Sequence, residues 1–287
     1  MLDSLPTPQP EFITPELAKE YLKHNKVNRP KRPDYIEGIA RDIKRGQYHP
    51  THQGIAFDEN GDLIDGQNRL YAIIEADTPI SILVSRNVKH SSGAYIDCGA
   101  ARTFRDSLAF DGRYSDDPAL RSSATAATVR ALFRNEMGEL RKLTNSEVLS
   151  VIGTMAEYLK GIYSATIGRT TVPAEVRAAA LAALLCGESP ADIFSFFSVF
   201  CSGNAKADGK NIAVVWNWKQ QIQNAKLQRR PISRDTLYRN SQNAIWHFCR
   251  GTGVQILKAT STNRYDVKDK LKTILDTVLG SNPSCAS

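Results

Sequence analysis

Cysteine is scarce in this sequence, and the few cysteines are not spaced as a metal or disulfide site requires. The 287 residues include 5 cysteines, with no Cys-x-x-Cys pair among them. An odd number without close spacing argues against a disulfide framework and against a zinc knuckle. The 5 histidines likewise lack the His-x-x-Glu-His or related spacing of a zinc site. We therefore expect the cysteines to be mostly packing residues.

Long apolar runs and a secretory leader are also lacking. Residues 1–12, MLDSLPTPQPEF, contain no basic patch followed by an apolar run. The longest apolar stretches, at 172–185 and 193–201, contain polar residues and are shorter than a bilayer span. A hydrophobic content of 41% is enough for packed globular cores, so a mainly disordered chain is not expected. We predict a cytoplasmic protein that does not enter a membrane.

Acidic residues are rare in only one part of the chain. Residues 1–110 carry 14 Lys and Arg against 15 Asp and Glu, and residues 111–202 carry 9 against 10. Residues 203–287 carry 14 against 5, so the positive excess lies entirely in this last third. A concentrated positive field raises the local density of polyanions. The charge pattern predicts a nucleic acid as partner, and a merely soluble basic surface is the alternative.

The pattern of the chain predicts an α+β protein of two domains. Residues 11–110 form the first domain, in which residues 11–88 have the order helix, basic loop, helix, strand, turn, strand, helix, strand. Thr14 and Pro15 are a helix start, and Gly46 is a helix stop. Residues 95–110 are expected to close this domain with a helix, and residues 111–118 form a linker.

The second domain, residues 119–280, is expected to be mostly α-helical. Helices of suitable length and periodicity are predicted at 119–137, 145–165, 173–187, 190–201, 212–225, 233–251 and 266–279. Residues 203–211 are either an internal loop or a second boundary.

The most informative motif lies where a strand is expected to enter a helix through a glycine, at residues 63–72. Backbone N–H groups at a helix start are unpaired, and the helix dipole favours negative charge there. Gly66 lets an oxyanion approach the backbone closely, and Arg69, one turn along, is a charge-assisted donor. Arg29, next to Asn28 on a proline-stiffened loop, is a second candidate phosphate contact. We predict a phosphate site here.

Asp65 has three alternative roles in this motif. A bare carboxylate repels a phosphate, so it is expected either to cap the helix, to hold a magnesium ion that bridges to the phosphate, or to act as a base toward a hydroxyl. The residues alone leave these roles open. Asp65 is therefore both the candidate catalytic residue and the candidate metal ligand.

The order of these features resembles the ParB/sulfiredoxin-like superfamily, especially its phage and mobile-element members. Over residues 11–105 the chain shares the order Asn28-Arg29-Pro30, a helix with an Ile36/Ile39/Ile43 face, Gly46, a hairpin and Asp65-Gly66-Gln67-Asn68-Arg69-Leu70-Tyr71-Ala72. That superfamily includes DNA-partitioning CTP-binding proteins, free-serine kinases, sulfiredoxins and proposed nucleases, and its strand-to-helix motif lies at a nucleotide phosphate site. The resemblance implies a ParB/sulfiredoxin-like N-terminal α/β domain that binds a nucleotide triphosphate with Mg²⁺. It implies phosphate binding by Asn28, Arg29, Gly66, Gln67, Asn68 and Arg69.

The motif also departs from the best-known members of that superfamily. Partitioning proteins have Glu, Arg and Arg where this chain has Gln67, Asn68 and Tyr71. Sulfiredoxins need a cysteine at the position of Gln67. The serine kinases share Asp65, Gly66 and Arg69 but have two histidines between the glycine and the arginine.

Basic residues gather around a proline in the last third of the chain. The candidate nucleic-acid contacts are Lys219, Lys226, Arg229, Arg230, Arg234 and Arg239. Trp216, Trp218 and Tyr238 lie nearby, and aromatic faces stack on unpaired bases. The alternative for the aromatic residues of this region is ordinary core packing, which we favour for Trp246 and Phe248.

Three functions fit the sequence. The first is a DNA-associated ParB-like protein of a phage or mobile element, which uses the α/β domain for a nucleotide or DNA phosphate and the basic third for nucleic acid. The second is a metal-dependent phosphotransferase or nuclease that uses Asp65 and Arg69. The third is a non-catalytic regulator that binds another protein. Assembly into an oligomer is compatible with each.

Overall fold

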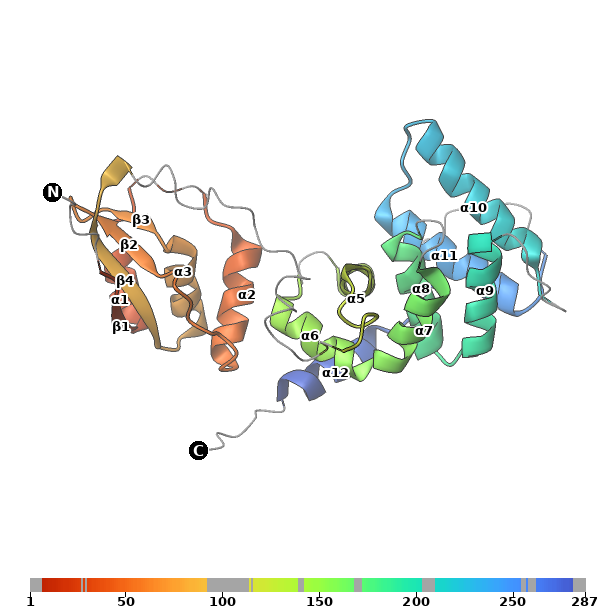
Figure 1. Cartoon of the computed structure of the whole chain (residues 1–287), viewed down its shortest axis with the longest axis horizontal. Coiled ribbons are helices and arrows are strands. Elements are labelled where there is room, and N and C mark those ends of the chain that lie inside the picture. The colour runs from red at the N-terminus through yellow and green to blue at the C-terminus, as the bar shows by residue number, and fades with distance from the viewer. Residues whose placement is uncertain are drawn as a thin grey trace. The chain divides into compact units, whose positions relative to one another are not determined.

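The computed structural model describes residues 7–26, 28, 30–91, 114, 116–138, 142–167, 172–202, 210–253, 257 and 262–280. Within these residues the chain forms eleven helices and a four-stranded sheet, which confirms the α+β class (Figure 1). The chain divides into two compact units, residues 1–102 with 282–287 and residues 103–281. The predicted closing helix at 95–110 and most of the predicted linker and sub-boundary lie outside the described residues.

The described part of the first unit is a small sheet with three helices. Its elements are β1 (Gln9–Ile13), α1 (Pro15–Leu22), α2 (Pro33–Lys44), β2 (Ile55–Asp58), β3 (Leu63–Asp65), α3 (Gln67–Ala76) and β4 (Ile80–Val88). The strand order is β1-β4-β2-β3, with β4 antiparallel to β1 and parallel to β2. Strands β2 and β3 form the predicted hairpin.

One face of this sheet forms the core of the unit. Side chains alternate across a strand, so Ile82 and Val84 of β4 point to the same face as Ile55 of β2. These residues are buried in one cluster with Ile36 of α2 and Leu70 of α3. The helices therefore cover this face of the sheet, and Leu63 of β3 belongs to the same buried cluster.

The helix ends of the first unit follow the predicted chemistry. The hydroxyl of Thr14 accepts a hydrogen bond from the amide of Leu17 at 3.2 Å, and Pro15 opens α1. Gly46, with φ at +64°, follows the end of α2. Both sequence predictions are confirmed.

Strand β1 was not predicted from the sequence. Its five residues include Pro10, and its only sheet neighbour is β4, with which Ile13 pairs opposite Ile80. Proline is tolerated on such an edge strand because one side of the strand needs no ladder hydrogen bonds. The sheet of the first unit thus includes residues 9 and 10, which precede the predicted start at residue 11.

The second unit is helical throughout its described residues. Its helices are α5 (Ser123–Met137), α6 (Asn145–Thr154), α7 (Ala156–Thr166), α8 (Ala174–Leu185), α9 (Pro190–Ser202), α10 (Ile212–Leu227), α11 (Arg234–Cys249) and α12 (Lys268–Gly280). Each of the seven predicted helices overlaps at least one of these eight elements. The predicted single helix at 145–165 is wrong, because Met155, with φ −114° and ψ 15°, breaks it into α6 and α7.

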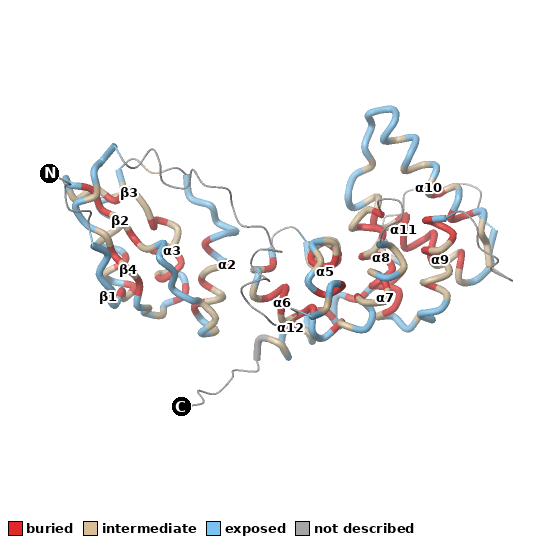
Figure 2. The backbone as a smooth tube through the Cα atoms, in the orientation of Figure 1, coloured by how far each residue is buried: buried red, intermediate tan, exposed pale blue. Residues whose placement is uncertain are grey.

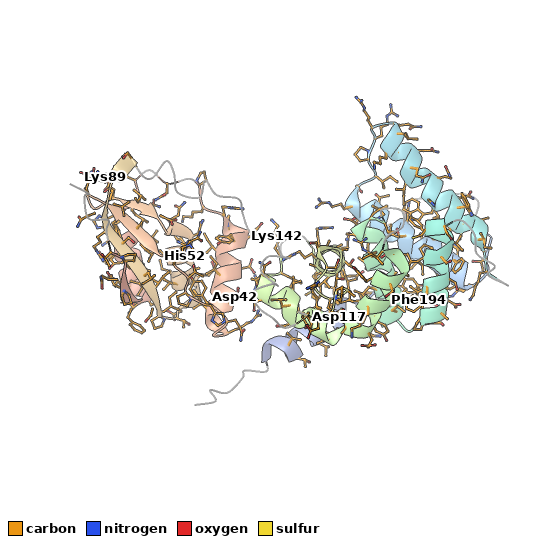
Figure 3. The ribbon with its side chains drawn as sticks, viewed as in Figure 1. Asp42, His52, Lys89, Asp117, Lys142 and Phe194 are labelled. Carbon is orange, nitrogen blue, oxygen red and sulfur yellow. The ribbon has the colours of Figure 1, made fainter. Side chains whose placement is uncertain are left out.

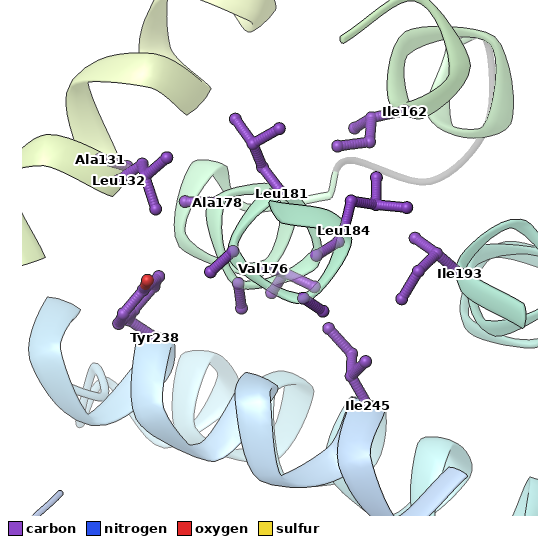
Figure 4. Close-up of a cluster of buried hydrophobic side chains, with 14 of the residues drawn as sticks. Ala131, Leu132, Ile162, Val176, Ala178, Leu181, Leu184, Ile193, Tyr238 and Ile245 are labelled. Carbon is purple, nitrogen blue, oxygen red and sulfur yellow. The ribbon is translucent and has the colours of Figure 1, made fainter. Parts of the chain in front are cut away.

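Helix α8 is the centre of the second unit. Its alanine-rich sequence is buried almost all round, which Figure 2 shows as a continuous buried stretch. A helix that is apolar on every side belongs in a core, and alanines let the neighbouring helices approach closely. In Figure 4, Leu181 and Leu184 of α8 are surrounded by side chains of other helices, among them Leu132, Ile162 and Ile245. This core fixes the position of α11.

No helix in the described part of the chain combines the length and the apolar character that a membrane crossing needs.

Candidate functional site

The strand-to-helix turn has the predicted backbone form. Strand β3 ends at Asp65, Gly66 adopts the left-handed conformation with φ at +97°, and α3 starts at Gln67. A Cβ atom at Gly66 would lie 2.9 Å from Cγ1 and 3.0 Å from Cα of Ile55. Glycine is thus required here by its conformation and by the close packing of the turn on β2, without any ligand.

The carboxylate of Asp65 is engaged by two neighbours. Its Oδ1 accepts a hydrogen bond from the amide of Gly66 at 2.6 Å. Its Oδ2 lies 3.6 Å from Nη1 of Arg69, and the Asp65 side chain is only 27% exposed. The predicted helix-capping role of Asp65 is wrong, because Gly66 is the N-cap residue of α3 and no side chain caps this helix. The carboxylate instead holds the turn through the amide of Gly66, and its roles toward a magnesium ion or a hydroxyl stay predictions.

Arg69 is turned toward the body of the first unit. Its Nη1 donates to the carbonyl oxygen of Gly54 at 2.5 Å, and its side chain is 15% exposed. The guanidinium therefore joins the start of α3 to the chain that enters β2. A phosphate would have to use the remaining N–H groups of Arg69 or replace these contacts.

Asn28 and Gln67 lie in one polar network beside this turn. The amide of Asn28 donates to Oδ1 of Asn25 and to the carbonyl oxygen of Leu63, each at 2.7 Å. Asn25 in turn donates to Oε1 of Gln67 at 3.1 Å. The sequence analysis missed Asn25, because nothing in its spacing marks it. Arg29 lies outside the described residues.

Asn68 differs from its neighbours in the motif. Its Oδ1 is buried and has no hydrogen-bond partner among the described residues. Tyr48 was also missed, and it lies near enough to Arg69 for the guanidinium to oppose the burial that raises the pKa of the phenol. The first turn of α3 therefore carries one buried and unsatisfied acceptor, on the residue that precedes Arg69.

The carboxylates do not assemble into a metal site in the described part of the chain. No group of three or more His, Cys, Asp or Glu side chains that could hold a metal ion occurs there. Asp62 pairs with Lys26 at 2.7 Å, and Glu37 pairs with Arg41 at 2.6 Å. Magnesium is commonly held through one or two carboxylates together with waters and substrate phosphates, so the magnesium role of Asp65 stays a prediction.

A second candidate site is the basic tip, which we define as residues 226–234 between the end of α10 and the start of α11. Lys226, Arg229 and Arg230 are exposed, and the side chain of Arg234 is 71% exposed. The end of α10 and the connection to α11 extend beyond the rest of the helical unit (Figures 1 and 2). The side chains at this end of α10 point away from the other helices (Figure 3).

The backbone of the basic tip is well defined by hydrogen bonds. The amide of Arg230 donates to the carbonyl of Ala225 at 2.9 Å, and the amide of Arg229 donates to that of Lys226 at 3.2 Å. These two bonds form a Schellman motif, with Arg229 at the left-handed position where glycine is usual. Arg229 has φ at +53°. The side chain of Ser233 then caps α11.

Two of the six predicted nucleic-acid contacts lie away from the basic tip and have internal partners. Lys219 donates to the carbonyl of Cys201 at 3.5 Å and lies 5.7 Å from the ring of Trp216. Arg239 pairs with Asp235 at 2.8 Å. The remaining four, Lys226, Arg229, Arg230 and Arg234, lie on the basic tip. Of these, Arg234 lies with its Nε 3.9 Å from Oε1 of Glu175, although its side chain is mostly exposed.

Most aromatic residues of this region are core residues. Nε1 of Trp218 donates to the hydroxyl of Ser241 at 3.0 Å, and Trp218 is fully buried. The hydroxyl of Tyr238 donates to Glu136 at 2.6 Å, and Tyr238 and Phe248 are also fully buried. The core interpretation is confirmed for Phe248. Trp216, at 39% exposure, is still accessible to a partner.

Comparisons of the chain with protein-family models, with curated proteins and with solved structures gave no match.

Proposed function

We propose that this protein binds nucleic acid through the basic tip. The observation that carries the proposal is the exposure of Lys226, Arg229, Arg230 and Arg234 on one protruding connection. Residues 209–234 contain no Asp or Glu, so this stretch of α10 and the tip has no negative charge of its own to offset these cations.

Phosphate contacts explain why such a surface would bind nucleic acid. Each cation placed on a phosphate releases condensed counterions, so binding is strong at low salt and weakens steeply as salt increases. A tip with a fixed backbone holds its cations at a constant spacing, which reduces the ordering cost of binding. The resemblance of the first unit to the ParB/sulfiredoxin-like superfamily agrees with a DNA-associated role in a phage or mobile element.

The test is binding of a labelled duplex of random sequence, measured by fluorescence anisotropy between about 50 and 200 mM salt. The variant is Lys226→Ala/Arg229→Gly/Arg230→Ala. If each cation contacts one phosphate, the slope of the logarithm of the association constant against the logarithm of the salt concentration should become less negative by about 2 to 3. Affinity at about 0.1 M salt should fall by roughly 100-fold.

A control with the same loss of formal charge is Lys19→Ala/Lys23→Ala/Lys44→Ala, which removes three exposed lysines of the first unit. It should bind within about twofold of the unmodified chain. Equal losses in both variants would show that net charge, rather than the basic tip, binds the duplex. Unchanged binding in the tip variant would overturn the proposal.

A second candidate function is nucleotide binding at the first turn of α3. The observation that favours it is the buried and unsatisfied Oδ1 of Asn68, next to Arg69. Leaving a buried acceptor unpaired costs about 1–3 kcal/mol, which a donor on a ligand recovers. A nucleotide supplies such donors in its ribose hydroxyl and base amino groups, and its phosphate suits the start of a helix.

This candidate is tested by the thermal midpoint of the full chain with nucleoside triphosphates, with and without Mg²⁺. A ligand that binds the native state at 100 times its Kd adds about 2.7 kcal/mol of stability. The increase should be lost in Asn68→Leu, which cannot accept from a ligand. A panel that leaves the midpoint unchanged would remove this function. Phosphotransfer or nuclease chemistry at Asp65 has no comparable observation in its favour, because its carboxylate already accepts from the amide of Gly66 and lies 3.6 Å from Nη1 of Arg69.

A further inference from the structure

Helix α10, which leads into the basic tip, has an exposed face of unusual composition. Among its exposed residues only Lys226 is charged, and the others are Ala213, Trp216, Gln220, Gln223, Asn224 and Leu227. Exposed helix faces are ordinarily rich in Lys, Glu and Arg, because these side chains are the most easily solvated. An exposed face of amides and apolar groups in the most basic third of the chain therefore needs an explanation.

The uncharged residues form a single stripe. At 100° per residue, Trp216, Gln220, Asn224 and Leu227 fall on one side of the helix. The buried residues Val214, Val215 and Trp218 lie on the opposite side, where α10 packs against α9 and α11. The stripe thus faces away from the helical body along the whole length of α10, and Leu227 at its end is 81% exposed.

Cations border this stripe. Lys226 lies along one edge of it, and Arg229 and Arg230 continue from its end. Lys219 lies along the same edge but donates to the carbonyl of Cys201. Acidic side chains are missing from residues 209–234, although they are common on exposed helices. Such an arrangement matches a duplex, because cations contact the phosphates on the rims of a groove and uncharged amides contact the base edges between them.

We infer that α10 is a recognition helix that lies in the major groove of duplex DNA, with Gln220, Gln223 and Asn224 toward the base edges. This inference rests on the proposed binding of nucleic acid by the basic tip. An α-helix with side chains is about 10–12 Å across and fits a major groove about 12 Å wide. Asn and Gln amides donate and accept at once, which matches N6 and N7 of adenine. Trp216 and Leu227 contact thymine methyl groups or sugar edges at the two ends.

A protein partner is the competing occupant of the same face. Trp216 and Leu227 are common anchors in protein interfaces. However, they lie about three turns apart on α10, and three exposed amides separate them. The cations beside the stripe and the absence of Asp and Glu from residues 209–234 favour a polyanion, so we infer DNA as the occupant.

The test is selection by the full chain from a pool of duplexes with a randomised centre. The unmodified chain should enrich a motif that contains A·T pairs. In Gln220→Ala/Asn224→Ala, the preference for that motif over a random duplex should fall by roughly 10- to 100-fold. Affinity for the random duplex and its salt dependence should stay within about twofold, because the phosphate contacts remain. Both amides are exposed, so their removal leaves the core intact.

The matched control is Gln9→Ala/Gln53→Ala, which removes two exposed amides of the first unit and should leave the preference unchanged. The inference fails if the unmodified chain binds duplexes but enriches no motif, or if the α10 variant enriches the same motif equally. Neither result contradicts the proposed binding of nucleic acid by the basic tip. Parallel loss of random-duplex affinity in the α10 variant would assign the amides to phosphates and overturn the inference. If the unmodified chain binds no duplex, the proposed function fails and the inference fails with it.

Discussion

The strand-to-helix turn and the basic tip both place arginine beside a left-handed residue at a helix end, yet they use it differently. Arg69 lies one turn inside the start of α3 and binds Gly54 and Asp65 of its own unit. Arg229 and Arg230 follow the end of α10 and are exposed. The helix dipole favours cations at a C-terminus, so Arg229 and Arg230 are tolerated without acidic partners among the described residues. A charged motif that is complete within the protein stabilises the fold, whereas one without internal partners is available to a ligand.

The largest effect is expected from Gly66→Ala, which tests whether the turn is primarily structural. The new Cβ would lie 2.9 Å from Ile55, in a backbone conformation with φ at +97°. The free energy of unfolding should fall by about 2–4 kcal/mol. All 3 tryptophans are in the helical unit, so the measurement is urea denaturation followed by circular dichroism, with hydrogen exchange of α3.

The control for this change is Gly46→Ala. Gly46 also has positive φ, but a Cβ there meets nothing within 4 Å, so the cost should be about 1 kcal/mol. Equal losses of the free energy of unfolding in the two variants would show that the packing of Gly66 against Ile55 is unimportant. The strand-to-helix turn could then not be called primarily structural.

A smaller effect is expected from Arg69→Gln, compared with Arg230→Gln. The first change removes the guanidinium that contacts Gly54 and Asp65, and should destabilise the first unit by about 1–3 kcal/mol. The second should change stability by less than about 0.5 kcal/mol, because Arg230 is exposed. Hydrogen exchange in each unit measures both. If Arg69→Gln is as stable as the unmodified chain, the arginine is not needed for the fold and a phosphate role for it gains support.

Glu136 extends the comparison to a carboxyl group that is buried among hydroxyl and amide donors. Burial raises its pKa above 4.5, and the hydrogen bonds from Tyr238 and Asn263 only partly oppose this. The folded state therefore binds the proton more tightly than the unfolded chain, and the free energy of unfolding falls as pH rises from about 4.5 through the raised pKa.

Glu136→Gln should remove this pH dependence, because the amide does not ionise while its oxygen still accepts the bonds from Tyr238 and Asn263. Its nitrogen cannot replace an acceptor of the bond from the backbone of Val267, which should cost about 1 kcal/mol near either pH. The measurement is urea denaturation followed by tryptophan fluorescence near pH 4 and near pH 7. The same pH dependence in both proteins would show that Glu136 ionises without penalty, in which case its burial does not perturb it.

The smallest effect is expected from Arg229→Gly alone. Glycine adopts φ near +53° without strain, so the thermal midpoint should rise by an amount equivalent to about 0.5–1 kcal/mol, while duplex affinity falls. Calorimetry and anisotropy measure the two effects on the same protein. A loss of stability would mean that the Arg229 side chain supports the tip, which would weaken its contrast with Arg69.

Much of the fold could be predicted from local sequence. The caps at Thr14 and Pro15, the stop at Gly46 and the hairpin before Asp65 depend on neighbouring residues, and all are present. Strand β1 could not be predicted, because its partner β4 is about 70 residues away and pairing alone defines it. The break at Met155 lies two residues after Gly153, a local signal that the prediction of one helix at 145–165 did not use.

The candidate sites were predictable in composition but not in geometry. The sequence indicates that Arg69 follows Gly66 by one turn, but the carbonyl that it binds belongs to Gly54, across the hairpin. The amides of α10 are equally visible in the sequence. Their importance depends on which side of the helix is buried, and that is decided by contacts with α9 and α11.

The basic tip has one further consequence, for limited proteolysis. Exposed connections with few contacts are preferred sites of nicking, and trypsin cuts after lysine and arginine but resists a bond that precedes proline. The bond between Arg229 and Arg230 is therefore a cleavage site in an exposed connection, whereas the next bond is protected by Pro231. A cut there would separate α10 from α11 in sequence while their packed faces still hold them together. A bound duplex would shield this bond, so the rate of nicking reports occupancy of the tip without any label.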